Sequence, residues 1–436
     1  MALYLETVSK IISYFTKSEF VKNALTLTFG SVIAQILPLI FYPILGRIFL
    51  PAEFGLLATL SAITAIIAII SSGMYESSIL ISKSKQEAAN IVGLILLRSL
   101  KILLVFFILL QLSGYQIGKW LNEPDLHKWI FVCPIGAFSI VVFNCFNEWC
   151  VTNKYFVRLS WNKIINTSSI TIGKVAFGII KIFGNGLIIG DLFGKVITAG
   201  SCVFRALKYD KKDFLNISYS QFKPLTKKYI EFPKYSMPDQ LLSNIGGSIP
   251  VFLIAAFFSS TEVGYFSIAA TVLTVPISVI SAAIRDVFRQ RANEECKNNG
   301  NCKNIYKRLL IILSTAGIVA SIAGFFILPD LFSIILGTQW RISGIYSQIL
   351  LPMFLLSFVS MSLSGVLIIT KKLRISMYWQ MYYVCSTLLS CLVGIFVFKD
   401  IKMTLLCFCI GRCSAYALYI YLSYRYSKIG ISIQQT

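Results

Sequence analysis

Residues 54–72 read FGLLATLSAITAIIAIISS, a stretch without a charged side chain. An α-helix needs about 20 apolar residues to cross the roughly 30 Å hydrocarbon core of a bilayer. A strand of a membrane barrel would instead alternate apolar and polar residues over about ten positions. This stretch does not alternate in that way, so it predicts a transmembrane helix.

The same pattern recurs along the whole chain of 436 residues, which is 56% hydrophobic with a mean hydropathy of +0.74. Only 14% of the residues are charged, against roughly 25% in soluble proteins. We therefore predict an all-α integral membrane protein with about twelve transmembrane helices in two six-helix bundles. The predicted spans are 23–49, 54–81, 88–112, 127–152, 157–182, 186–205, 236–259, 262–284, 306–328, 344–370, 375–398 and 403–424.

The longest polar stretch separates the first six spans from the last six. It contains a run of lysines, among them Lys208, Lys211 and Lys212. Before the first span, apolar residues at helical spacing lie on one side of a predicted helix and lysines lie on the opposite side. This pattern is typical of a helix that lies on a membrane surface. The predicted organisation is an interfacial segment 1–22, an N-terminal lobe 23–205, a basic linker 206–235, a C-terminal lobe 236–424 and a tail 425–436.

The formal charge of +21 would suggest a nucleic-acid partner in a soluble protein. When alternate loops are assigned to opposite sides, however, 28 of the Lys and Arg residues fall on the side of the N-terminus and 6 on the other. Cytoplasmic loops of membrane proteins carry this excess of positive charge. Both termini are therefore predicted to be cytoplasmic, and the charge requires no nucleic acid.

Two short segments echo one another. Residues 51–58 read PAEFGLLA and residues 260–267 read STEVGYFS, so Glu53 matches Glu262 and Gly55 matches Gly264 at one constant offset. Each segment opens a predicted span, the second and the eighth. The match suggests a parallel repeat, with two lobes related by an axis along the membrane normal and substrate bound between them.

The sequence offers little for catalysis or metal binding. The eleven cysteines lie mostly in apolar runs without a CxxC pair, and His127 is the one histidine. We therefore predict no disulfide framework and no metal site. No Ser/His/Asp set and no phosphate-binding glycine loop is visible. The sequence thus predicts no catalytic residues, no cofactor and no enzyme activity.

Six basic residues inside the predicted spans are the most informative polar feature. If all six side chains faced lipid at mid-depth, inserting them into the membrane would cost on the order of 15 to 20 kcal/mol. They are therefore expected to line an interior cavity that binds an anionic substrate, although Lys181 could reach the outer interface and Lys195 could pair with Asp191 four residues back. The predicted substrate-binding residues are Arg98, Lys101, Lys174, Lys181, Lys195 and Arg412.

Carboxylates in or near the spans are candidates for ion coupling, because a membrane-embedded acid can carry a proton or sodium. Asp191 is the first choice, followed by Glu148 and Asp239. Glu76, Glu148 and Asp239 lie near predicted cytoplasmic ends, where ordinary solvation is the alternative. Aromatic residues expected in a belt at the outer interface are Tyr115, Trp120, Trp129 and Trp340.

Several short motifs, in this order along the chain, carry a family resemblance. They are residues 46–55 (GRIFLPAEFG), Tyr75-Glu76 with Ile79, residues 186–190 (GLIIG) with Gly194, residues 232–238 (FPKYSMP), Val263-Gly-Tyr265, Pro276, Val287-Phe288 and residues 336–340 (LGTQW). On these motifs the sequence resembles, over nearly its whole length, polysaccharide flippases of the Wzx type, within the superfamily of multidrug and toxin extruders and lipid II flippases. Met74 stands where such proteins often carry a basic residue, and Asp191 where they often carry a neutral one.

The resemblance implies an extruder-like fold and a location in the bacterial inner membrane. It also implies that the protein moves undecaprenyl-diphosphate-linked oligosaccharides, such as O-antigen repeat units, from the cytoplasmic to the periplasmic leaflet. The implied partners are the lipid-linked oligosaccharide, the lipid bilayer and other membrane proteins of polysaccharide assembly. A small-molecule exporter of the same fold is the alternative, but it would prefer acidic residues for organic cations, whereas these spans carry basic ones.

Overall fold

The computed structural model describes residues 19–180, 185–370 and 372–429, and these form helices without any strand. Lys181 and residues 1–18 of the predicted interfacial segment lie outside the described residues. The first half contains α2 (Glu19–Ile48), α3 (Pro51–Ser72), α4 (Glu76–Ile79), α5 (Lys85–Trp120), α6 (Leu126–Trp129), α7 (Val132–Thr152), α8 (Phe156–Ile180), α9 (Gly186–Tyr209), α10 (Lys211–Leu215) and α11 (Phe222–Lys228). The second half contains α12 (Met237–Phe257), α13 (Ser260–Asn299), α14 (Lys303–Leu336), α15 (Arg341–Ser362), α16 (Val366–Ile369), α17 (Leu373–Val393) and α18 (Ile401–Ile429).

Twelve of these helices have more than 20 residues, and eleven of the twelve are long and apolar enough to cross a membrane. The remaining one is α8, whose sequence contains Arg158, Lys163 and Lys174 together with several Asn, Ser and Thr residues. The prediction of an all-α membrane fold with about twelve transmembrane helices is confirmed. The polar character of α8 is a first sign of where function lies.

Several predicted boundaries are wrong. The predicted span 54–81 is broken after Ser72, because Gly73 and Met74 both adopt positive φ angles, 62° and 58°. The left-handed backbone at these two positions cannot continue a right-handed helix. The predicted span 344–370 likewise ends at Ser362, before Gly365 with a φ of 119°. Much of the predicted loop 285–308 is helical, since α13 extends to Asn299 and α14 begins at Lys303.

The chain forms two compact units. The first comprises Met1–Phe41, Ile63–Ser113 and Lys128–Asp239, and the second comprises Tyr42–Ala62, Gly114–His127 and Gln240–Thr436. The dividing points fall inside α2, α3, α5, α6 and α12, so these helices contribute residues to both units.

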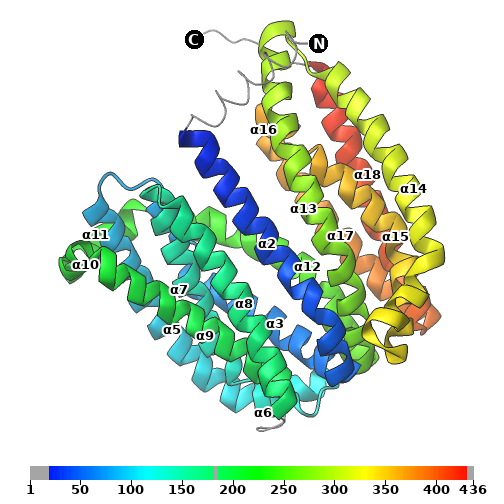
Figure 1. Ribbon diagram of the computed structural model, residues 1–436, viewed down its shortest axis with the longest axis horizontal. Coiled ribbons are helices and arrows are strands. Elements are labelled where there is room, and N and C mark those ends of the chain that lie inside the picture. The colour runs from blue at the N-terminus through cyan, green and yellow to red at the C-terminus, as the bar shows by residue number, and fades with distance from the viewer. Residues whose placement is uncertain (1–18, 181–184, 371, 430–436) are drawn as a thin grey trace, which may run out of the picture. The chain divides into compact units, whose positions relative to one another are not determined.

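In the first unit, α8 runs along α9, and α9 also packs against α7 (Figure 1). Glycines bring the backbones of α8 and α9 together. A Cβ atom at Gly190 would lie 2.4 Å from the backbone nitrogen of Lys174, and one at Gly194 would lie 2.3 Å from the Cα atom of Ile170. Small residues at helix interfaces allow such close approach. This contact sets the register that places Lys174 opposite α9.

In the second unit, the two echoing segments contact each other. A Cβ atom at Gly55 would lie 1.8 Å from the carbonyl oxygen of Ser260, and one at Gly264 would lie 1.8 Å from the carbonyl oxygen of Pro51. Each glycine therefore faces the first residue of the other segment. This reciprocal pattern is what a two-fold relation between equivalent segments produces, and it supports the internal repeat.

The prediction for Trp340 is wrong. Its side chain is 0% exposed, so it cannot belong to an interfacial belt. The indole Nε1–H donates to the carbonyl oxygen of Gly46 at 2.8 Å, and the ring meets Phe54 edge-on at a centroid distance of 5.2 Å. Buried tryptophans usually find such a partner for their N–H group. Trp340 thus joins the segment around Gly46–Gly55 to the start of α15. Tyr115 and Trp120, by contrast, are 73% and 69% exposed.

Candidate functional site

A cluster of two lysines around one aspartate lies between α8 and α9. Lys174 Nζ lies 2.9 Å from Asp191 Oδ1, and Lys195 Nζ lies 2.6 Å from Asp191 Oδ2. The side chains of Lys174, Lys195 and Asp191 are 18%, 17% and 11% exposed. The predicted pairing of Lys195 with Asp191 is confirmed, and Lys174 adds a second cation. The cluster therefore carries one positive charge in excess.

A third lysine continues this basic surface along α8. Lys163 Nζ donates to Ser31 Oγ on α2 at 2.9 Å. Among the described residues Lys163 forms no ion pair, and its ammonium group is held by the hydroxyl of Ser31. Lys163 and Lys174 are eleven residues apart, about three helical turns, and so share a face of α8. The first unit thus presents Lys163, Lys174 and Lys195, and Asp191 pairs with the last two.

The other predicted basic residues do not join this cluster. The Arg98 guanidinium lies 4.9 Å from the ring centroid of Tyr75, next to Gly73 at the end of α3. Lys101 is exposed on α5. Their predicted role in substrate binding stays a prediction, and Arg98 also has a structural partner.

Arg412 lies in the second unit, where its side chain is almost fully buried. It is 4% exposed, and its Nη2 donates to the carbonyl oxygen of Gly246 on α12 at 2.8 Å. Its guanidinium lies 3.8 Å from the ring centroid of Tyr383 on α17. These contacts link α12, α17 and α18. They are what is expected of a cation that holds three helices together.

The predicted coupling acids occupy three different environments. Asp191 is held between two ammonium groups, and Asp239 is exposed in the first turn of α12. Glu148 is half-buried on α7, and it lies near Glu76. These assignments stay predictions, but the geometry separates Asp191, which is paired with two lysines, from Glu148 and Asp239.

Glu76 is the acid whose environment could not be predicted. It is 7% exposed, its Oε1 accepts a hydrogen bond from Ser72 Oγ at 3.1 Å, and its Oε2 has no partner among the described residues. Burial raises the pKa of the Glu76 carboxyl above its ordinary value. The ionisable groups around it are Glu148 and Cys145 on α7, Arg98 on α5 and the adjacent Tyr75.

The raised pKa of Glu76 predicts a pH-dependent stability. Between the ordinary glutamate pKa, about 4.3, and its own higher pKa, the folded protein holds a proton that the unfolded chain has lost. Stability therefore falls as pH rises through this window. We expect the melting temperature of Glu76→Gln in detergent to lose this fall, and to exceed the wild-type value above the window.

Glu231→Gln, which changes an exposed glutamate, is the matched control and is expected to keep the wild-type slope. An unchanged slope in Glu76→Gln would mean that Glu76 is ionised throughout the tested range.

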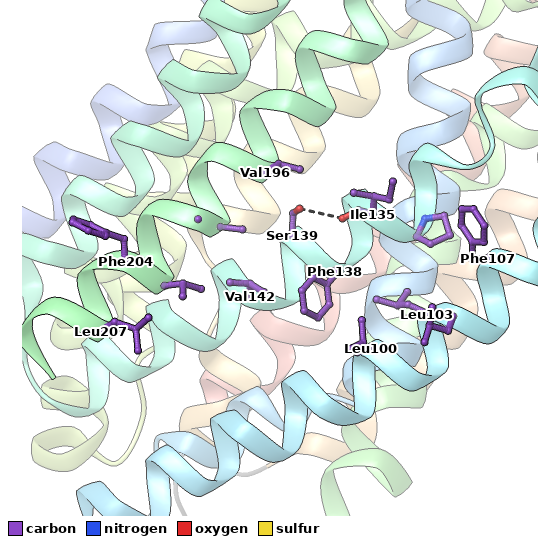
Figure 2. A pocket seen from close by; sticks show the side chains of 15 residues that line it. Leu100, Leu103, Phe107, Ile135, Phe138, Ser139, Val142, Val196, Phe204 and Leu207 are labelled. Atoms are coloured by element: carbon purple, nitrogen blue, oxygen red, sulfur yellow. Dashed lines mark hydrogen bonds between the residues drawn. The ribbon is translucent and has the colours of Figure 1, made fainter. Parts of the chain in front are cut away.

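A groove of about 670 Å³ runs between α5, α7 and α9 in the first unit. Figure 2 shows Phe204 and Leu207 of α9 at one end and Phe107 of α5 toward the other, with Phe138 and Val142 of α7 between them. Ser139 is the one hydroxyl side chain among the lining residues, and it donates to the carbonyl oxygen of Ile135 at 3.0 Å. The groove has no charged lining residue, so it suits hydrocarbon rather than a sugar or a phosphate.

Comparisons with known proteins agree with this fold. The structure of an inward-facing multidrug resistance MATE family transporter of the MOP superfamily superimposes with a TM-score of 0.68 at 16% identity, covering 92% of this chain and 98% of that chain. The inward closed structure of the lipid II flippase MurJ gives a TM-score of 0.66 at 13% identity, covering 94% and 87%. The bent form of the Vibrio cholerae MATE transporter VcmN gives 0.58 at 13% identity, covering 93% and 96%.

No curated protein matches the chain. The sequence does match the model of a protein family described as polysaccharide biosynthesis protein, over residues 44–344. This region includes the broken helix with Glu76, the lysine cluster of α8 and α9, and Trp340. The chain therefore belongs to the polysaccharide biosynthesis protein family and has the fold of MATE and MurJ transporters.

Proposed function

We propose that this protein is a flippase that carries a lipid-linked oligosaccharide across a bacterial inner membrane, from the cytoplasmic to the periplasmic leaflet. The observation that carries the proposal is the Lys174–Asp191–Lys195 cluster, which holds an excess positive charge within two long helices. A sugar attached to lipid through a diphosphate presents concentrated negative charge. Membership of a polysaccharide biosynthesis family supports a saccharide as the cargo.

The lysine cluster suits reversible binding of phosphate. Without cargo, Asp191 balances part of the charge of Lys174 and Lys195, which lowers the cost of keeping two ammonium groups buried. Phosphate oxygens can then accept hydrogen bonds from N–H groups that do not contact the carboxylate, because each ammonium group has three donors. Lys163, with a hydroxyl partner, offers a further cation along the same face. The lipid chain stays in hydrocarbon while the head group follows this basic face.

For energy coupling we propose proton binding at Glu76 and Glu148 rather than at Asp191. A carboxylate held by two ammonium groups at 2.9 and 2.6 Å already has both its oxygens paired with cations, so we assign it the role of a counterion. Glu76 has an unpartnered oxygen and an acidic neighbour, which favour a bound proton. Release of that proton would alter the contacts at the break between α3 and α4.

The excess of Lys and Arg on one side supports the topology that we propose. In it, the lysine-rich linker and both termini lie in the cytoplasm, where other membrane proteins of polysaccharide assembly supply the finished oligosaccharide. The undecaprenyl-diphosphate carrier and an O-antigen-type cargo are part of this proposal.

Deleting the gene in its host tests the function. We expect the surface polysaccharide to disappear and complete lipid-linked repeat units to accumulate in the cytoplasmic leaflet. An unchanged polysaccharide with greater sensitivity to cationic drugs would contradict the flippase proposal and favour a small-molecule exporter of the same fold.

Replacing Lys174 or Lys195 by glutamine in the complementing gene tests the site. Each replacement leaves Asp191 with one cation and a neutral cluster. A hydrogen bond to a charged group contributes about 1.5 to 3 kcal/mol, so we expect polymer export to fall roughly ten- to hundredfold at equal protein level. Lys223→Gln and Lys227→Gln, on exposed positions of α11, serve as controls. Export that is unchanged in both cluster variants would remove Lys174 and Lys195 from the proposed path.

A further inference from the structure

The apolar groove between α5, α7 and α9 lies next to a group of exposed lysines. Leu207 lines the groove near the end of α9, and Lys208, Lys211 and Lys212 follow within five residues. All three lysines are exposed, and none forms an ion pair with another described residue. Lys208 Nζ lies 5.4 Å from the ring centroid of Tyr209. An elongated apolar surface that ends in cations without an ion-pair partner is the chemical complement of a lipid with an anionic head group.

The acids beside these lysines do not neutralise them. Asp210 is buried, where it pairs with Arg158 Nη1 at 2.5 Å and accepts a hydrogen bond from Trp149 Nε1 at 3.2 Å. Asp213, half-buried in α10, is the other carboxylate in the segment. Three ammonium groups thus face one available carboxylate, and the segment keeps a positive charge.

The residues around these lysines also suit the boundary between hydrocarbon and water. Tyr209, Leu215 and Tyr219 are 62%, 69% and 69% exposed. Aromatic and aliphatic side chains interleaved with lysines are typical of segments that lie at the level of lipid head groups. This composition is what we expect at the depth where a phospholipid carries its phosphate.

We propose that the groove is a binding site for an anionic phospholipid of the cytoplasmic leaflet. One acyl chain lies along Leu100, Phe138, Ala199 and Phe204, and Lys208, Lys211 and Lys212 hold the phosphate and the net negative charge. The groove volume of about 670 Å³ suits an acyl chain of ordinary length better than the much longer chain of a polyprenyl carrier. The lysine cluster at Asp191 is a separate site, so this lipid would be a resident ligand and not the cargo.

Gly200 provides a sharp test of the groove. It lines the groove, and a Cβ atom added there would meet no atom within 4 Å. Gly200→Phe therefore begins its side chain in open space and adds a ring to the groove that the acyl chain would occupy. Gly247 on α12 also has open space around its Cβ position and lines none of the described grooves. Gly247→Phe is thus a matched control.

The experiment is native mass spectrometry of the full-length protein in neutral detergent, with phosphatidylglycerol and phosphatidylethanolamine of identical acyl chains. Each lysine near an anionic lipid surface strengthens binding by roughly fivefold. Three lysines therefore predict a preference for phosphatidylglycerol over phosphatidylethanolamine of at least roughly tenfold. We expect Lys208→Gln, Lys211→Gln and Lys212→Gln together to abolish the preference. Gly200→Phe is expected to lose retention of both lipids.

The control variants Gly247→Phe and Lys223→Gln with Lys227→Gln are expected to retain lipid as the wild type does. Equal retention of the two phospholipids by the wild type would overturn the proposal, as would wild-type retention by Gly200→Phe. Displacement of phosphatidylglycerol by an equal concentration of undecaprenyl phosphate would also overturn it, because the groove would then belong to the cargo chain. None of these outcomes depends on transport, so the flippase proposal is tested separately.

Discussion

Replacing Gly55 by alanine is expected to destabilise the protein by about 3 kcal/mol, the upper part of the range for overpacking a tight interface. The new Cβ atom would lie 1.8 Å from the carbonyl oxygen of Ser260, and backbone cannot move aside as the end of a side chain can. Gly264→Ala meets the equivalent obstacle at Pro51. Alanine inside a helix is otherwise favoured over glycine by roughly 1 kcal/mol, so a loss of stability would report the close contact itself.

The measurement is thermal denaturation in detergent, followed by tryptophan fluorescence. Gly200→Ala is the matched control, since its Cβ atom meets open space, and we expect it to be neutral or slightly stabilising. The double variant Gly55→Ala with Gly264→Ala should cost less than the sum of the two single changes. Either alanine alone already separates the same pair of segments. The free-energy changes caused by substitutions at such contacting positions are not additive. Strict additivity, or stable single variants, would show that the segments do not meet in this way.

The sequence alone predicted the repeat but not the contact between its copies. The constant offset of Glu53 and Gly55 from Glu262 and Gly264 is visible in the letters. That each glycine lies against the first residue of the other copy depends on tertiary packing, which the sequence does not state. The helical class was predictable because apolar runs of membrane length are a strong signal.

The lysine cluster was predictable in part. Lys195 and Asp191 are four residues apart, so one helical turn brings them together and the pairing follows from spacing. The partnership of Lys174 with Asp191 requires α8 and α9 to pack in one register. That register depends on glycines such as Gly190, which look like any other small residues of a membrane helix until the neighbour is known.

The errors have local causes. The positive φ angles of Gly73 and Met74 end a helix that was predicted to continue. The break was missed because a methionine in the sequence gives no sign of a positive φ angle. Glu76 follows the same break and is buried, whereas its position near a predicted membrane end had left solvation open as the alternative. Trp340 was assigned to the interface from its position between spans, whereas its indole donates to Gly46 from inside the second unit. In each case a local feature of the folded structure overrode the expectation drawn from the residue's position along the sequence.

Replacing Asp191 by asparagine is expected to be the most damaging single change in the lysine cluster. It leaves the half-buried Lys174 and Lys195 with no carboxylate between them. Removing one partner of a fully buried ion pair costs roughly 3 to 5 kcal/mol, and we expect a loss at the lower end of this range. Lys174→Gln or Lys195→Gln should cost less, because Asp191 keeps a cation in either variant. Thermal denaturation in detergent should therefore rank Asp191→Asn below both lysine variants.

Combining Asp191→Asn with Lys174→Gln and Lys195→Gln separates stability from transport. The triple variant buries no charge at this site, and replacing a whole buried ionic group by neutral residues is often close to neutral in stability. We expect its melting temperature to recover most of the loss seen in Asp191→Asn. Export of polysaccharide should nevertheless be lost, because the ammonium groups of Lys174 and Lys195 are no longer present. Recovery of export together with stability would contradict a role for these lysines in binding the anionic head group, because the cluster would then serve the fold alone.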